Sequence, residues 1–250
     1  MASGLPGVDW WPVIGTSILF LILALTHNLL HYNALVVHLV LVGGNRTALW
    51  LYTLLMLPGV LLHELSHAVT AKLLLLEVSD FSIGPVVTDD EVWLGYVTAE
   101  KADVFRNSIV GLAPLVAGTG AILLINLLVF DFTRVHDALA AGNWLTVMHT
   151  LAEGFSSKWS WLAVYLIFAV SANMFPSRAD RRYWLPVLLF LLLILAIAWV
   201  MGVIPALTQR LVEPINWLFR WLMLIFGFAL VIDLPILLLF AAGTRAVTKP

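Results

Sequence analysis

The chain has 250 residues, of which 62% are hydrophobic and 11% are charged, and its formal net charge is −2. Soluble domains carry about 25% charged residues, so this composition indicates a polytopic protein whose partner is the lipid bilayer. A chain without excess positive charge is a poor match for nucleic acid. The sequence has no cysteine, which excludes disulfides and thiolate ligands and leaves His, Asp, Glu and water for a metal ion.

Six apolar segments are long enough to be predicted as membrane spans, because a span needs about 20 residues. The first, 11–42, is long, and it is compatible with one tilted helix or with two shorter helices broken near Asn28. The other five are 48–76, 107–130, 159–175, 183–203 and 214–242. Residues 131–158 form a polar, partly amphipathic connection to which we assign no chemistry. We therefore expect an all-α polytopic membrane protein with about six transmembrane helices.

Residues 77–101 differ from the spans, since valines and aromatic residues alternate there with Gly, Pro and Asp. This pattern predicts two or three short strands with a turn near Asp89. A strand edge cannot face lipid, so we expect this β segment at the membrane interface or within the protein. The segment is either a plain hairpin connector or an edge that pairs with an extended peptide.

Positive residues follow the predicted fourth and sixth spans, at Arg178, Arg181, Arg182, Arg245 and Lys249. Because cytoplasmic loops are enriched in Lys and Arg, these ends are expected in the cytoplasm. With six spans the N-terminus is cytoplasmic too. We therefore expect an integral protein of the cell membrane with both termini in the cytoplasm.

The span 48–76 contains the sequence His63-Glu64-Leu65-Ser66-His67. Residues four apart share one face of a helix, so both imidazoles can bind one metal ion. Glu64 lies about 100° around the helix from His63, where it can reach a water on that ion. This is the HExxH pattern of zinc hydrolases, with Glu64 as general base. The alternative is that the two histidines and the glutamate are buried and satisfy one another.

A catalytic zinc ion needs a third protein ligand from another element. Glu77 is too far along the same helix, whereas Asp180 and Asp233 are both suitable, and spacing alone does not separate them. Three further histidines, His27, His31 and His38, precede the motif. His27 and His31 repeat the four-residue spacing without an acid between them, and we interpret them as a polar face packed into the helix bundle.

Four motifs together resemble the site-2 protease family of intramembrane zinc metalloproteases. The first is HExxH within a span, and the second is 78–85, which is similar to the F-x-x-G stretch of the family. The third is Gly111-Leu112-Ala113-Pro114, a loosened Gly-Pro motif. The fourth is Asn173-Met174-Phe175-Pro176, similar to N-x-x-P, with Asp180 downstream as the aspartate ligand. The residues around Asp180 differ from the Leu-Asp-Gly of the family, which indicates a divergent branch.

This resemblance implies a zinc ion held by His63, His67 and Asp180, with Glu64 as general base and Asn173 holding the substrate backbone or the oxyanion. It implies hydrolysis of a peptide bond in or next to a transmembrane segment of a membrane-protein substrate. The chain then divides into N-terminal span(s) over 1–47, a catalytic membrane core over 48–182 and two C-terminal spans over 183–250.

A metal-binding membrane transporter or a non-proteolytic pseudo-enzyme is the alternative. It would use His63, His67 and Asp233, with His27 and His31 along the path. A carrier has no need of Glu64 beside its histidines.

Overall fold

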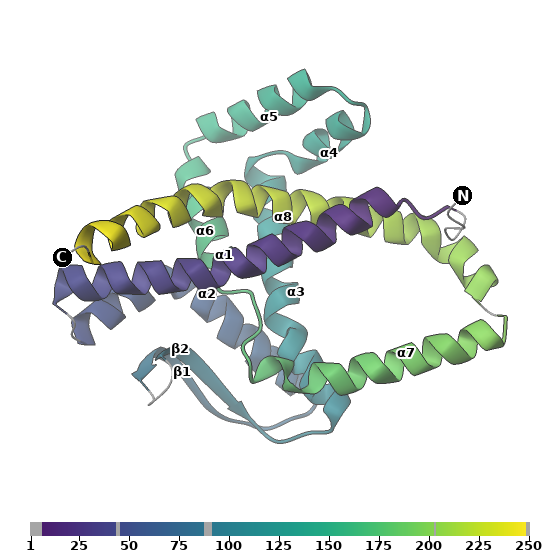
Figure 1. Ribbon diagram of the computed structural model, residues 1–250, viewed down its shortest axis with the longest axis horizontal. Coiled ribbons are helices and arrows are strands. Elements are labelled where there is room, and N and C mark those ends of the chain that lie inside the picture. Colours follow the sequence, from purple (N-terminus) through teal and green to yellow (C-terminus); the bar gives the residue numbers. More distant parts are fainter. Residues whose placement is uncertain (1–6, 44–45, 88–91, 203, 249–250) are drawn as a thin grey trace.

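The computed structural model describes residues 7–43, 46–87, 92–202 and 204–248. Within these residues, five stretches are long and apolar enough to cross a membrane. Four are the helices α1 (Trp10–Val42), α2 (Arg46–Leu73), α3 (Val104–Val129) and α8 (Ile204–Thr248), and the fifth is the short 3₁₀ helix η1 (Asp180–Tyr183) continued by α7 (Trp184–Val200). The expected all-α polytopic membrane fold is confirmed (Figure 1).

The first apolar segment is one helix, not two. Asp9 accepts a hydrogen bond from the Trp11 N–H at the start of α1, and Gly43 ends the helix with a φ of 88°. A left-handed φ favours glycine, which has no Cβ to clash. Helix α1 packs along α8, so the first and the last helix of the chain lie side by side (Figure 1).

The predicted fourth span, 159–175, is helical only as α6 (Ser160–Ser171). A helix of 12 residues is about 18 Å long, short of the roughly 30 Å hydrocarbon core. Residues 172–175 leave the helix but stay buried. Their carbonyl groups therefore need donors from elsewhere in the protein.

The β segment is an antiparallel hairpin of β1 (Val78–Val87) and β2 (Val92–Ala99), and the turn predicted near Asp89 lies outside the described residues. The hairpin packs on α2: a Cβ added at Gly95 would lie 2.9 Å from the Glu64 Cγ. On the hairpin itself, the Tyr96 hydroxyl donates to Asp80 across 2.8 Å, and this bond raises the pKa of Tyr96. The hairpin thus covers one side of the HExxH motif.

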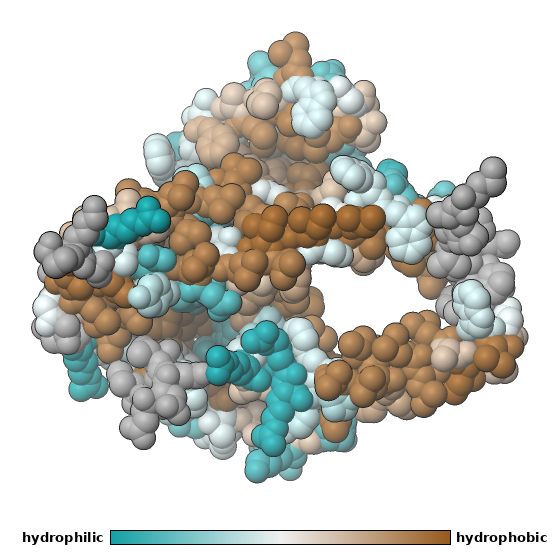
Figure 2. Space-filling view, in the orientation of Figure 1, coloured by the Kyte–Doolittle hydropathy of each residue, from teal (hydrophilic) through white to brown (hydrophobic). Residues whose placement is uncertain are grey.

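The connection 131–158 folds into two amphipathic helices, α4 (Phe132–Ala140) and α5 (Trp144–Ser156). They lie at the opposite end of α3 from the hairpin (Figure 1). Helix α7 has no buried residue, and the space-filling view shows open space between it and α8 (Figure 2). Its apolar side chains are therefore free to face lipid.

Close approach of α2 to α6 depends on Gly59. A Cβ at this position would collide with the backbone carbonyl oxygen of Ala169 and lie 2.8 Å from the Asn173 Nδ2. The Ala169 carbonyl is part of the backbone of α6, so the helices themselves must separate if a methyl group is added.

We predict that Gly59→Ala lowers the free energy of unfolding by about 1–3 kcal/mol, the usual cost of overpacking. Thermal unfolding of the detergent-solubilised protein measures it. Gly120→Ala is the matched control, because a Cβ added at Gly120 in α3 would have no neighbouring atom within 4 Å, and alanine favours a helix. Equal unfolding temperatures for the two variants would show that α2 and α6 are not in tight contact.

Candidate metal centre

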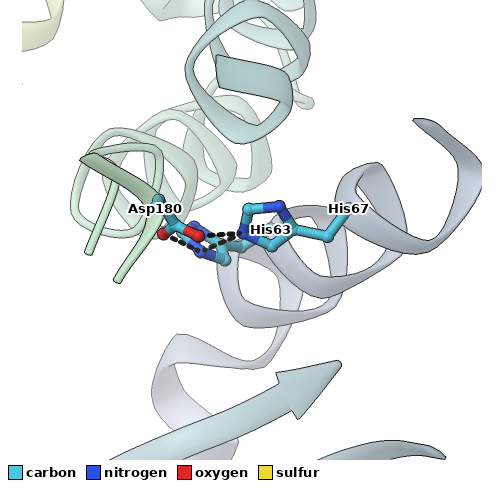
Figure 3. A group of neighbouring side chains, drawn as sticks. All are labelled: His63, His67 and Asp180. Carbon is cyan, nitrogen blue, oxygen red and sulfur yellow. Dashed lines mark hydrogen bonds and ion pairs between the residues drawn. The ribbon is translucent and has the colours of Figure 1, made fainter. Parts of the chain in front are cut away.

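His63 and His67 on α2 and Asp180 at the start of η1 bring their ligand atoms within 4.8 Å of one another (Figure 3). The two Nε2 atoms are 3.2 Å apart. One carboxylate oxygen of Asp180 lies 3.3 Å from the His67 Nε2, and the other lies 3.9 Å from the His63 Nε2. Side chains from two segments more than 100 residues apart in sequence thus converge on one point.

Backbone carbonyls fix the proton positions on both rings. The His63 Nδ1 lies 2.6 Å from the Asn173 carbonyl oxygen, and the His67 Nδ1 lies 2.9 Å from the Val110 carbonyl oxygen. Because a carbonyl can only accept, each Nδ1 carries the proton and donates it. In the neutral ring each Nε2 is then unprotonated and carries a free lone pair. This is the form of histidine that binds metal ions.

The geometry fits a zinc ion. Two lone pairs that face each other across 3.2 Å repel unless a cation lies near both. Tetrahedral zinc with bonds of about 2.0–2.1 Å to each nitrogen places the two nitrogens about 3.3–3.4 Å apart. Three protein ligands leave the fourth tetrahedral position for water. The donor set of two imidazoles and one carboxylate therefore suits catalytic zinc.

Pro114 makes the Val110 carbonyl available to His67. In a helix the carbonyl of residue i accepts from the N–H of residue i+4, and the residue four beyond Val110 is Pro114, which has no N–H. The imidazole N–H of His67 takes the place of that missing donor. A proline inside a membrane helix is tolerated where a neighbour satisfies the freed carbonyl in this way.

Asp180 is held in place from two sides. Its carboxylate accepts from the Ser177 N–H across 2.7 Å, and its own N–H donates to the Ser177 Oγ across 3.2 Å. On the other side α3 approaches closely at Gly111, where an added Cβ would collide with the Asp180 backbone carbonyl. The loosened Gly-Pro motif thus supplies both the close contact beside Asp180 and the free carbonyl for His67.

The structure brings Asp180 to the histidine pair and places Asp233 elsewhere. Asp233, on α8, is 2% exposed and accepts from the Ser171 hydroxyl across 2.9 Å. Among the described residues, the group able to hold a metal ion contains Asp180 and not Asp233. Of the two aspartates that spacing left open, geometry therefore favours the one that the resemblance indicated.

Glu64 is buried beside the histidines, at 8% exposed, under the β hairpin. The Nδ1 atoms of His63 and His67 bond backbone carbonyls, their Nε2 atoms face each other, and Asp180 faces both rings. Glu64 is not part of these contacts, so the alternative of three mutually satisfied side chains does not describe the arrangement. Its carboxylate remains available for chemistry.

Asn173 contributes through its backbone. Its carbonyl receives the His63 N–H, while its side-chain amide donates to the Ala169 carbonyl across 2.8 Å. The expected role of the Asn173 side chain in holding substrate stays a prediction. The backbone role was not foreseen from the sequence.

The histidines of α1 bind carbonyl oxygens too. His27 and His31 both contact the Ala172 carbonyl, and His38 contacts the Ala34 carbonyl of its own helix. This agrees with their interpretation as a polar face packed into the bundle.

Comparison of the chain with protein-family models, with curated proteins and with solved structures finds no match. The chemistry of the site is therefore inferred from its own geometry. Two imidazoles with Nε2 atoms facing one point lie beside the Asp180 carboxylate, and the buried Glu64 is on the same helix as the imidazoles.

We predict that the purified protein binds one zinc ion per chain and that Asp180→Ala weakens this binding by at least about 100-fold, since even outer partners of metal ligands contribute 10–100-fold. Zinc content after dialysis against a chelator series measures it. Asp233→Asn is the matched control and should bind as the wild type does. Loss of zinc from Asp233→Asn but not from Asp180→Ala would reverse the assignment of the third ligand.

Proposed function

We propose that this protein is an intramembrane zinc metalloprotease, a divergent member of the site-2 protease family. It hydrolyses a peptide bond in or next to a transmembrane segment of a membrane-protein substrate. The observation that carries the proposal is the convergence of the His63 and His67 Nε2 atoms and the Asp180 carboxylate, next to Glu64, in a bundle of membrane-length helices.

The residues of the site have distinct roles in this reaction. His63, His67 and Asp180 would hold the zinc ion, which supplies a Lewis acid that activates water and polarises the scissile carbonyl. Glu64 accepts a proton from the attacking water and returns it to the leaving amine. Burial of Glu64 beneath the hairpin keeps its carboxylate close to the histidines and away from bulk solvent.

The hairpin supports binding of an extended substrate. A transmembrane helix must unwind before attack, because its carbonyls are otherwise bonded within the helix. Within the part of the chain that the structure describes, the sheet consists of β1 and β2 alone, so no third strand covers either outer edge, and β2 touches Glu64 through Gly95. A substrate strand added to this sheet would recover part of its lost hydrogen bonding close to the general base.

An apolar groove offers a route from the lipid. It has a volume of about 570 Å³ and lies between α1, α3 and α8, with Phe20, Leu115 and Leu222 among its lining residues. Leu115 is four residues, or about 6 Å along the helix, from Gly111 at the metal centre. Such a surface suits an apolar helix better than a soluble peptide.

We place the protein in the cell membrane, with the loop after α6 and the end of α8 on the cytoplasmic side. Arg178, Arg181 and Arg182 follow α6, and Arg245 lies in the last turn of α8. These positions favour the cytoplasm by the positive-inside rule. Lys249 lies outside the described residues.

Helices α1 and α8 run parallel, since Asp9 at the start of α1 bonds Arg220 and Asn33 near its end bonds Thr244. The start of α1 therefore lies at the opposite end of this pair from the end of α8, and the two ends of the chain are not placed on one side.

The transport alternative finds less support. Asp233 is engaged with Ser171, and His27 and His31 are engaged with the Ala172 carbonyl. The residues that would extend a metal path beyond the centre are thus already bonded to protein groups. Glu64 has a clear task in hydrolysis and none in transport.

We predict that Glu64→Gln keeps the zinc ion but lowers the cleavage rate by about 10²–10⁴-fold, the range expected for loss of a general base. Cleavage of a panel of single-span membrane proteins in proteoliposomes measures it, with zinc content determined in parallel. Glu77→Gln is the matched control, because Glu77 is an exposed glutamate just beyond α2.

If Glu64→Gln cleaved its substrates at the wild-type rate, Glu64 would not be the general base and the proposed mechanism would be wrong. Transport would be established instead if the wild type cleaved no substrate and zinc entered the proteoliposomes equally fast with the wild type and with Glu64→Gln.

A further inference from the structure

The Ala172 carbonyl oxygen receives two imidazoles from α1. The His27 Nδ1 and the His31 Nε2 each lie 2.6 Å from it. This carbonyl has no helical donor, because α6 ends at Ser171 and the residue four beyond Ala172 is Pro176. Since a carbonyl only accepts, both ring nitrogens must be protonated and donating. A buried acceptor with two donors is held more firmly than most backbone groups.

The next carbonyl in the chain belongs to the metal centre. Asn173, which follows Ala172, accepts the N–H of the zinc ligand His63. Imidazoles from α1 and α2 therefore bind consecutive carbonyls of one short non-helical segment. The direction of the Asn173 carbonyl depends on the Ala172–Asn173 peptide plane, and that carbonyl in turn sets the tautomer and the ring angle of His63.

Tyr52 links the α1 histidines back to the zinc helix. Its hydroxyl contacts the His31 Nδ1. That nitrogen is an acceptor, because the single proton of the neutral ring is on Nε2, so the tyrosine donates. Tyr52 and His63 are eleven residues apart on α2, which is about three turns, so both lie on the same face of the helix. A closed ring of bonds thus runs from α2 through His31 to Ala172 and returns through Asn173 to His63.

We propose that His27 and His31 are positioning residues of the metal centre. They hold the Ala172–Asn173 peptide and through it orient His63 toward the zinc ion. This inference rests on the metal centre of the proposed function and assigns a role to a histidine pair that does not itself bind the metal. Outer partners of this kind contribute about 10–100-fold to metal affinity.

The proposal can be tested with variants that remove or preserve the two N–H donors to the Ala172 carbonyl. In His27→Leu/His31→Leu both donors are lost. In His27→Asn/His31→Gln an amide N–H replaces each donating nitrogen, because Asn matches the reach of Nδ1 and Gln that of Nε2. Asn28→Leu is the matched control, since Asn28 lies on α1 between the two histidines but is exposed and bonds Ala24 of its own helix.

The full-length protein in detergent is titrated with zinc against a chelator, and its cobalt derivative is examined by visible spectroscopy. We expect the double leucine variant to bind zinc about 10–100-fold more weakly and to show an altered cobalt spectrum. The Asn/Gln variant and Asn28→Leu should match the wild type in both measurements. If the double leucine variant fails to fold, single His27→Leu keeps the Tyr52–His31–Ala172 contacts and should show a smaller change in the same direction.

Wild-type zinc affinity and cobalt spectrum in the leucine variants would overturn the positioning role alone. The same holds for a lower unfolding temperature accompanied by an unchanged spectrum, since that is the result of a purely structural role. A wild-type protein that binds no metal would overturn both the metal centre and this inference.

Discussion

Backbone carbonyls that no helical N–H can reach are the acceptors on which the candidate metal centre of this protein depends. In a lipid environment such groups must find donors within the protein. The Val110 and Ala172 carbonyls have no helical donor, because the residues four positions beyond them, Pro114 and Pro176, have no N–H. The Asn173 carbonyl has none because it lies beyond the end of α6. Imidazole N–H groups satisfy all of them. One set of hydrogen bonds therefore meets the structural need of the bundle and leaves the ligand nitrogens of His63 and His67 free for a metal ion.

Close backbone contacts bring the parts of the centre together. Gly59 lets α2 meet the end of α6, Gly111 lets α3 meet the backbone of Asp180, and Gly95 lets β2 lie against Glu64. Small residues commonly allow such approaches in membrane bundles, where packing rather than hydrophobic burial drives helix association. The outer helix α7 has no buried residue. The helices and the strand that surround the site are thus held close together at these three glycines.

Much of the architecture could be predicted from the sequence because it depends on local pattern. Apolar length located α1, α2, α3, α7 and α8, and the alternation in 77–101 located the hairpin. The HExxH spacing placed His63 and His67 on one helix face, because residues four apart in a helix lie on the same side. Apolar composition also located α6, but its predicted end was wrong, since that composition continues to Phe175 although the helix ends at Ser171. The helices α4 and α5 escaped prediction, because amphipathic segments resemble polar connections in an apolar chain.

The contacts between distant residues were harder to foresee. Spacing could not separate Asp180 from Asp233, since the choice depends on how closely α3 approaches η1 at Gly111. The resemblance to a family supplied what the spacing lacked. The carbonyl partners of the histidines did leave a signal: a proline four residues beyond a buried carbonyl marks an acceptor in need of a donor. Pro114 and Pro176 are such prolines, and the histidines on neighbouring helices are the donors available in this chain.

X-ray absorption at the zinc K-edge of the purified protein is the most direct test of the central claim, because it reports the ligands of the ion itself. The account predicts one zinc per chain with two imidazole nitrogens at about 2.0–2.1 Å and carboxylate or water oxygens at about 2.0–2.2 Å. A protein without stoichiometric metal, or a zinc ion whose spectrum lacks the scattering of two imidazole rings, would contradict it.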